Sequence, residues 1–221
     1  MDPCFRRGDI SDFGFPQQKL IRAKPSVRGR FECAMRIIAG AKRGMKLLSP
    51  KTYDSRPITD RVKESLFSVL YKYDLPAGAV VGDLFSGVGS LGLEALSRGA
   101  EFATFVERDR QTAAILEKNI AKAGFVERSK VVRTDAFGFG APSDSKAGRC
   151  NLVFIDPPYA TTRDVGEGSA LSGLLDVLGG QAANDAVIVV RVRQGTELLD
   201  RYGRFEVVER RRWGTMAVTI L

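Results

Sequence analysis

The segment Asp156-Pro157-Pro158-Tyr159 directly follows the apolar run NLVFI and is the most specific chemical pattern in the chain. An exocyclic amine of a nucleic-acid base is a poor nucleophile, because its lone pair is delocalised into the ring. Two acceptors facing its two N–H bonds make the nitrogen more tetrahedral. The Asp156 carboxylate and the Pro157 carbonyl can be these acceptors, because the two prolines restrict φ, and Tyr159 can stack on the base. The pattern predicts attack of a base amine on a methyl sulfonium, with no histidine needed, and the chain has none.

A Pro-Pro turn that merely ends a strand is the alternative interpretation of this segment. Two observations favour a reaction site: the segment follows the fourth predicted strand, and a glycine-rich loop follows the first. That loop contains Gly87, Gly89 and Gly92, which fit G-x-G-x-x-G between a strand and a helix. Glycines allow a tight turn and close approach of the backbone to a ligand.

Three carboxylates stand at or near the ends of successive predicted strands: Asp83, Glu107 and Asp135, the last followed by Ala136. Open α/β sheets bind ligands at the carboxyl ends of their strands. The Glu107 carboxylate can accept both hydroxyls of a ribose there. The set predicts a nucleoside-containing cofactor.

The glycine loop alone also fits a nicotinamide cofactor. Asp83 lies just ahead of the loop and can bind a cationic amino acid group, whereas a pyrophosphate is disfavoured beside an unpaired carboxylate. Phe85 and Ser86 make the loop polar and aromatic. These features favour S-adenosylmethionine over NAD.

Strands and helices must alternate to bring these residues together, and the apolar pattern predicts that they do. Alternation calls for a parallel sheet with right-handed crossovers. Strands are predicted at 79–85, 102–107, 130–135, 151–156 and 186–192, helices at 60–71, 91–98, 110–123 and 171–178, and a terminal hairpin at 204–212 and 215–221. The prediction is therefore an α/β fold with a mostly parallel seven-stranded sheet that ends in an antiparallel hairpin.

The N-terminal quarter carries the positive charge. Residues 1–63 hold 15 Lys/Arg and 6 Asp/Glu, whereas residues 64–221 hold 19 and 20, so the balances are +9 and −1 and sum to the net charge of +8. A localised basic segment is typical of a polyanion-binding protein. Residues 1–34 lack apolar periodicity and are expected to be a disordered extension. Residues 35–58 are expected to form a basic β-hairpin extension, with strands at Arg36–Ile38 and Met45–Leu48, and residues 59–221 the catalytic domain.

The remaining composition excludes several classes of protein. No apolar run approaches the roughly 20 residues that span a bilayer, and the N-terminus has no apolar signal region. The three cysteines show no C-x-x-C spacing, which argues against a zinc site or a disulfide framework and suits a reducing compartment. We expect a cytoplasmic protein without a bound metal and without a membrane partner.

At these motifs the chain resembles the class I methyltransferases that modify exocyclic amines, and more closely the RsmD-like family of 16S rRNA guanine-N2 methyltransferases. The resemblance covers residues 35–221 and is most specific in RIIAGAKRGMKL, SRPITDRVKESLF, DLFSGVGSLGLEALSRGA, FVERD and FIDPPY. One departure lies in the fifth strand, where the family often has acidic residues and this chain has Arg191-Val-Arg193-Gln194.

The resemblance implies a role for each matching position. Asp83, Phe85, Gly87 and Gly89 would surround the methionine part of the cofactor, with Ser86 in the same loop. Glu107 and Arg108 would lie at the ribose, and Asp135 and Ala136 at the adenine. The guanine amine would be held by Asp156, Pro157 and Tyr159, with Pro158 in the same motif. The substrate RNA would be bound by Arg36, Lys42, Arg43, Lys46, Arg56, Thr59 and Arg61.

Other functions stay open at this point. An adenine-N6 methyltransferase of DNA or RNA would use the same Asp-Pro-Pro-Tyr segment. An NAD-dependent oxidoreductase would need a proton-relay residue, and a non-catalytic RNA-binding protein would have no use for the carboxylates. Arg210-Arg211-Arg212 is either a solvated strand end or part of a phosphate track. The expected partner is ribosomal RNA, within a small-subunit particle and bound by a monomer.

Overall fold

The computed structural model describes residues 35–50, 58–142 and 147–221. The extension expected at 1–34 and the predicted RNA-binding residue Arg56 lie outside the described residues. None of the helices in the described ranges is both long and apolar enough to cross a membrane.

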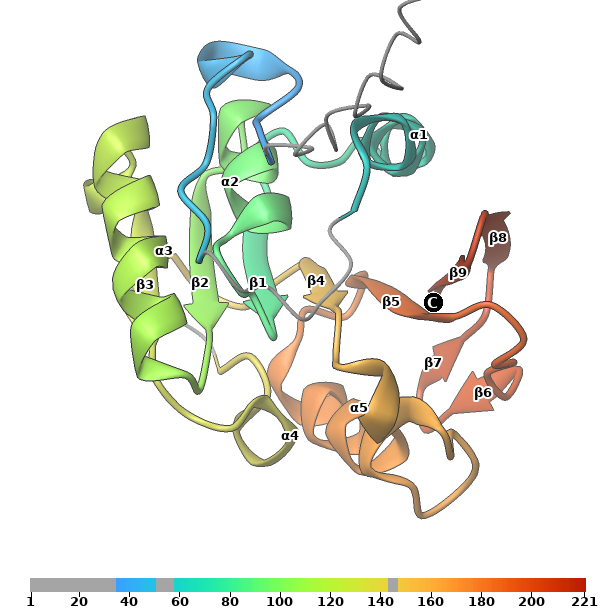
Figure 1. Ribbon diagram of the computed structural model, residues 1–221. Helices are drawn as coiled ribbons and strands as arrows, with labels where there is room; N and C mark the ends of the chain where they lie inside the picture. The colour runs from blue at the N-terminus through green and yellow to red at the C-terminus, as the bar shows by residue number, and fades with distance from the viewer. Residues whose placement is uncertain (1–34, 51–57, 143–146) are drawn as a thin grey trace, which may run out of the picture. The chain divides into compact units, whose positions relative to one another are not determined.

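One mixed sheet of seven strands organises the described part of the chain, in the order β3-β2-β1-β4-β5-β9-β8 (Figure 1). The first five are parallel, and β9 runs antiparallel to both β5 and β8. The fold expected from the sequence, a class I methyltransferase sheet with an antiparallel hairpin at one side, is confirmed. The strands are β1 (Val80–Leu84), β2 (Phe102–Val106), β3 (Ser129–Val132), β4 (Leu152–Ile155), β5 (Val187–Arg193), β8 (Glu209–Trp213) and β9 (Met216–Ile220).

Helices cover both faces of the sheet, as its strands require, since β1 and β4 are buried throughout. On one face pack α1 (Asp60–Leu70), α2 (Ser90–Ser97) and α3 (Arg110–Ala123), and on the other α4 (Ala136–Phe139) and α5 (Ala170–Gln181) (Figure 1). Short 3-10 turns lie at Gly40–Lys42, Tyr71–Tyr73, Val126–Arg128 and Tyr159–Thr162. The helices meet the sheet through two apolar cores, one around Phe67, Phe105 and Phe154, the other around Leu174 and Ile188.

Local capping sets the helix boundaries. Thr59, Asp109 and Ser169 precede α1, α3 and α5, and each side chain accepts a hydrogen bond from a backbone N–H of the first turn. Gly124 ends α3 in a left-handed conformation, with φ of 71°. The predicted helix at 110–123 is therefore confirmed to the residue.

Three parts of the chain depart from the sequence-based expectations. The loop after β3 contains the short helix α4, capped by Asp135. The expected strand at 204–212 is divided: β6 (Arg201–Tyr202) and β7 (Phe205–Glu206) form a separate two-stranded sheet, and only β8 joins the main sheet. The division follows from the hydrogen bonds of Val207, which donates to Asp200, and Val208, which donates to Ile220.

The N-terminal hairpin is the third departure. Its backbone follows the expected path, with Ile37 N–H donating to Met45 and Leu47 N–H donating to Met35, but its two strands reduce to the single bridge between Arg36 and Lys46. The ladder stops because the next two N–H groups, of Ile38 and Ala39, donate to the Glu94 carboxylate instead, over 2.8 and 3.0 Å.

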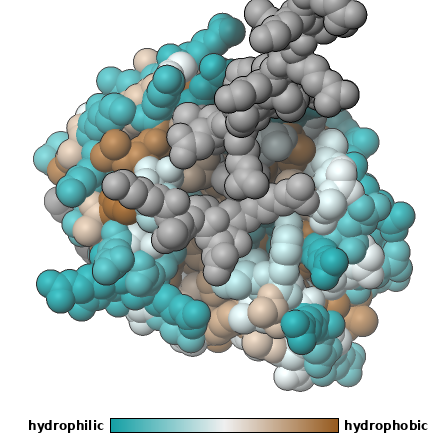
Figure 2. Space-filling view, viewed as in Figure 1, coloured by the Kyte–Doolittle hydropathy of each residue, from teal (hydrophilic) through white to brown (hydrophobic). Residues whose placement is uncertain are grey.

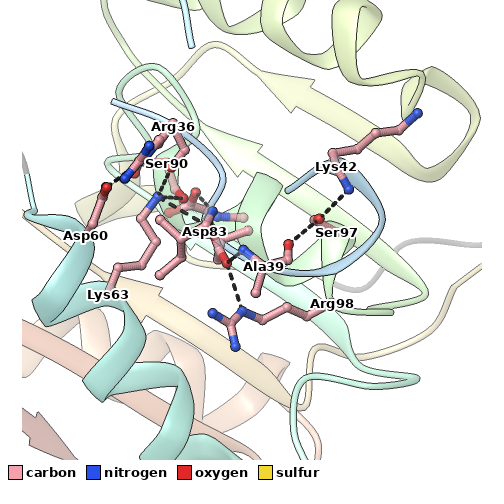
Figure 3. Close-up of polar contacts among 12 residues, drawn as sticks. Arg36, Ala39, Lys42, Asp60, Lys63, Asp83, Ser90, Ser97 and Arg98 are labelled. Carbon is pink, nitrogen blue, oxygen red and sulfur yellow. Dashed lines mark hydrogen bonds and ion pairs between the residues drawn. The ribbon is translucent and has the colours of Figure 1, made fainter. Parts of the chain in front are cut away.

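Glu94 is the centre of a buried polar network that joins this hairpin to α1 and α2. Its partners Ala39, Lys63 and Arg98 are labelled in Figure 3. Its carboxylate also lies 3.5 Å from Lys63 Nζ and 2.8 Å from Arg98 Nε. Lys63 in turn donates to the Arg36 carbonyl. Both Glu94 and Lys63 are almost fully buried. Burial lowers the pKa of Lys63, and the adjacent Glu94 opposes that shift. A buried carboxylate with this many donors is well compensated.

We expect Glu94→Ala to lower the free energy of unfolding by about 3–5 kcal/mol, because it leaves the buried Lys63 charge without its partner. Urea denaturation of the variant and the wild type measures the difference. Glu117→Ala, at an exposed position of α3, is the matched control and is expected to change stability by less than about 0.5 kcal/mol. Equal losses in the two variants would contradict this account of the network.

Candidate active site

A pocket of about 820 Å³ lies at the carboxyl ends of the parallel strands. The sheet order reverses between β1 and β4, and open α/β sheets bind ligands at such a switch point. The pocket brings together nearly all the predicted cofactor and catalytic residues: Asp83, Phe85, Ser86, Gly87, Glu107, Arg108, Asp135, Ala136, Asp156, Pro157, Pro158 and Tyr159. Gly89 does not line the pocket; with its left-handed φ it shapes the backbone of the glycine loop.

The glycine loop between β1 and α2 is shaped by left-handed residues. Phe85, Gly87 and Gly89 have φ of 60°, 55° and 87°. Such a φ in Phe85, which has a side chain, is uncommon and is found most often at functional loops. At Gly92 a Cβ would lie 2.4 Å from the Phe105 ring and 2.9 Å from Asp83 Oδ2. The motif therefore allows α2 to pack closely on the strands and brings its first turn against Asp83.

Asp83 is a buried carboxyl, 2% exposed, whose Oδ2 accepts the Gly92 N–H over 2.8 Å. Burial raises the pKa of Asp83 to about 8; the hydrogen bond from Gly92 opposes the shift, and the nearby Asp156 and Glu107 add to it. Ionisation of this group requires a compensating positive charge. The site is therefore suited to a cationic ligand group.

Glu107 and Asp135 hold the loops that follow β2 and β3. Glu107 Oε2 accepts the Gly87 N–H over 2.9 Å, and Oε1 accepts the Asp109 N–H over 2.8 Å. One carboxylate thus ties the glycine loop to the start of α3. Asp135 Oδ1 accepts the Phe137 N–H over 3.1 Å at the start of α4. The Phe137 ring packs edge-on against Phe85, with centroids 4.8 Å apart. Phe137 was missed in the sequence because the helix that places it, α4, was not expected.

The Asp156-Pro-Pro-Tyr segment follows β4, the neighbour of β1, and lines the same pocket; the Asp156 N–H donates to the Leu84 carbonyl. Pro157 is buried, and the Pro158 carbonyl accepts the Thr161 N–H, which fixes the turn. The Tyr159 hydroxyl is buried and has no hydrogen-bond partner among the described residues. The Asp156 carboxylate is 18% exposed, and its Oδ1 accepts from Arg191 Nε over 2.5 Å. Burial raises the pKa of Asp156, and the Arg191 charge and hydrogen bond oppose the shift.

Arg191 and Arg193 also line the pocket and were not predicted to do so. The pairing register of β4 and β5 is the property that places Arg191 beside Asp156. Ile155 of β4 pairs with Val190 of β5, so the next residues along, Asp156 and Arg191, are neighbours.

The predicted RNA-binding residues that the structure describes lie outside the pocket. Arg36 is exposed and pairs with Asp60 over 2.7 Å, and Arg43 and Lys46 are exposed on the hairpin. Lys42 lies 6.0 Å from the Phe125 ring centre. The Thr59 side chain caps α1.

Arg61 lines a second, more open groove between α1 and β8, together with Lys72, Arg210, Arg211, Arg212 and Trp213. Several of these cations pair with carboxylates, as Arg210 does with Asp200 and Arg212 with Glu197, which reduces the positive charge available to phosphate. Among the described residues, no group of three or more His, Cys, Asp or Glu side chains could hold a metal ion.

A family model described as Conserved hypothetical protein 95 matches residues 35–221. The chain belongs to this family. The expected membership of an RsmD-like methyltransferase family is thereby confirmed, and the matched range is the one over which the motifs resembled it. Its glycine loop, Glu107 and the Asp156 segment all lie within the match.

Relatives of known name support the assignment. The chain is 45% identical over 127 residues to ribosomal RNA small subunit methyltransferase D of Escherichia coli, which is 57% of this chain and 60% of that protein. YlbH of Bacillus subtilis, described as a candidate rRNA methyltransferase, is 32% identical to the chain over 186 residues. The match covers 84% of this chain and 97% of YlbH. A solved Escherichia coli structure, the candidate methyltransferase yhhF, has a TM-score of 0.70 and 34% identity over 85% of this chain and 96% of its own.

We expect Asp83→Asn to stabilise the ligand-free protein in a pH-dependent way. The folded state raises the pKa of Asp83 from 3.8 to about 8, so the wild type loses stability as pH rises through this window. The Asn variant has no such loss. Its advantage should be small near pH 4, grow toward pH 8 and reach about 5 kcal/mol. Thermal unfolding of both proteins across this range measures it, and an advantage independent of pH would contradict the prediction.

Proposed function

We propose that this protein transfers a methyl group from S-adenosylmethionine to the exocyclic N2 of a guanine in 16S ribosomal RNA. The observation that carries the proposal is the lining of one pocket: the acidic glycine loop and Asp156, Pro157 and Tyr159 meet there, at the ends of neighbouring strands. The glycine loop suits a cationic nucleoside cofactor, and the Asp156 segment suits an amine that must be activated without a strong base.

The chain's own residues fit that cofactor. Asp83, buried and in need of a positive partner, would bind its ammonium group beside the loop of Phe85, Ser86, Gly87 and Gly89. Glu107 and Arg108 would hold the ribose. The adenine would lie at Asp135 and Ala136, next to Phe85. When bound, the cofactor supplies an electrophilic methyl group on a positively charged sulfur, which becomes a neutral thioether once the methyl has been transferred.

Asp156, Pro157 and Tyr159 would activate and hold the amine. Its two N–H bonds donate to the Asp156 carboxylate and the Pro157 carbonyl, which localises the lone pair on nitrogen. Tyr159 holds the base in plane and limits its motion. The nitrogen becomes acidic as it gains the methyl carbon, so Asp156 accepts the released proton and passes it to water.

Ribosomal RNA is the proposed substrate because the relatives named above are described as rRNA methyltransferases. The phosphate backbone would be contacted by the hairpin cations Arg36, Lys42, Arg43 and Lys46. Further contacts would come from Arg56, from Thr59, which caps α1, and from Arg61 in α1. Hydrophilic residues occupy much of the outer edge of the face drawn in Figure 2. A base must leave its stack to reach Asp156, which costs least in single-stranded RNA.

The proposed organisation assigns residues 35–58 to substrate binding and 59–221 to catalysis, with 1–34 as an extension. The protein would act as a monomer, without a metal, on a small-subunit particle in the cytoplasm.

Adenine N6 is the second candidate target, because an acceptor pair of this kind suits either base amine. Nucleoside analysis of ribosomal subunits methylated with labelled cofactor distinguishes the two. N2-methylguanosine in the small subunit is the expected product, and N6-methyladenosine would overturn the guanine assignment.

We expect Asp156→Ala to abolish methyl transfer and to leave the affinity for S-adenosylhomocysteine nearly unchanged, because the carboxylate acts on the amine and not on the cofactor. Single-turnover assays and calorimetric titration measure the two effects. Asp83→Asn is the matched comparison and should weaken binding of S-adenosylhomocysteine at least tenfold, or about 1.4 kcal/mol. Loss of cofactor affinity in the Asp156 variant would contradict this division of roles.

A further inference from the structure

Arg191 is fixed beside Asp156 by the backbone of two central strands. β4 and β5 are parallel neighbours, with Ile155 paired to Val190, and β5 is held on its other side by β9, where Arg191 pairs with Val218. The arginine therefore projects from the interior of the sheet, and its residue is 9% exposed. Its position depends on the sheet rather than on a loop.

The contact between the two side chains uses only part of each. Arg191 Nε donates to Asp156 Oδ1 over 2.5 Å, which leaves Oδ2 available to another donor. Arg191 Nη1 is buried and has no hydrogen-bond partner in the described part of the chain. A pair that served only stability would be expected to satisfy both groups. The unused Oδ2 and Nη1 instead indicate that Arg191 orients a carboxylate whose second oxygen binds another group.

The charged groups of the pocket make the ionisation of Asp156 depend on Arg191. The other ionisable groups that line the pocket around Asp156 are Asp83, Glu107, Asp109 and Asp135, the cations Arg108 and Arg193, and Tyr159 of its own segment. Of these, Asp83 interacts unfavourably with Asp156. Burial raises the pKa of Asp156, and Arg191 is the group that opposes the rise. Without the arginine, the carboxyl group would hold its proton to higher pH, would accept an N–H more weakly and could not take up the released proton.

We propose that Arg191 is a positioning residue for methyl transfer: it keeps Asp156 ionised and turns Oδ2 toward the substrate amine. The inference rests on the proposed function, since it takes Asp156 as the acceptor of the amine.

The test measures the ionisation of Asp156 directly. Protein labelled with ¹³C at the aspartate carboxyl carbon is titrated by NMR, and the Asp156 signal is assigned by its loss in Asp156→Asn. Arg191→Gln should raise the midpoint of that signal by about one pH unit or more. Arg191→Lys keeps the charge and should restore most of the wild-type midpoint. Arg201→Gln removes the same charge from the exposed β6–β7 hairpin and should leave the midpoint unchanged.

Single-turnover methylation of small ribosomal subunits across the same pH range gives the second readout. The acid limb of the rate profile should move to higher pH in Arg191→Gln by the same amount as the NMR midpoint, so that activity lost at neutral pH returns on the alkaline side. S-adenosylhomocysteine titration confirms that each variant is folded, and its affinity should match that of the wild type.

The outcomes separate the two proposals. If the wild type methylates guanine and Arg191→Gln shifts neither the midpoint nor the acid limb, the role of Arg191 is overturned and the proposed function stands. A uniform fall in rate at every pH, without a shift, would likewise show a merely structural contact. If the wild type transfers no methyl group to the subunit while it binds S-adenosylhomocysteine, the proposed substrate is wrong, and the positioning role falls with it.

Discussion

The Glu94 carboxylate is the constraint on which the arrangement of the other elements depends. It receives two backbone N–H groups from the hairpin, the ammonium of Lys63 from α1 and the guanidinium of Arg98 from its own helix. Glu94 lies in α2, which begins at the glycine loop. The basic hairpin, the first helix and the cofactor loop are thus held by one buried group. A carboxylate can do this only because nearly every lone pair finds a donor.

The second constraint is the close approach of several carboxyl groups in the pocket, near the N-terminal end of α2. Asp83, Glu107, Asp135 and Asp156 converge on one pocket from the ends of four parallel strands. Each is compensated differently: Asp83 by one backbone N–H and its raised pKa, Glu107 by two N–H groups, Asp135 by the first turn of α4, and Asp156 by Arg191. A cationic cofactor relieves the repulsion that remains.

Much of this could be predicted from the sequence where the determining signal is local. The boundaries of α3 follow from Asp109 and Gly124, which flank an amphipathic run. The pocket residues follow from the rule that parallel strands present their carboxyl ends at one edge. Signals that depend on tertiary contacts were not visible. The hairpin strands shrank to one bridge because Glu94, some 55 positions away, takes their N–H groups. The role of Arg191 is not visible in the sequence, because its partner is set by register between strands and not by spacing along the chain.

The hydrogen bond between Gly92 and Asp83 also bears on which cofactors the fold rejects. Glycine loops at helix N-termini usually bind phosphate, because the exposed N–H groups of the first turn form an anion site. In this chain one such N–H is already occupied by a carboxylate that belongs to the protein. An incoming pyrophosphate would meet a filled donor and a nearby acidic group. The chain thus places its own acidic group where dinucleotide-binding proteins leave room for the phosphate of their ligand. The same glycine motif therefore favours a cationic ligand here and an anionic one in those proteins.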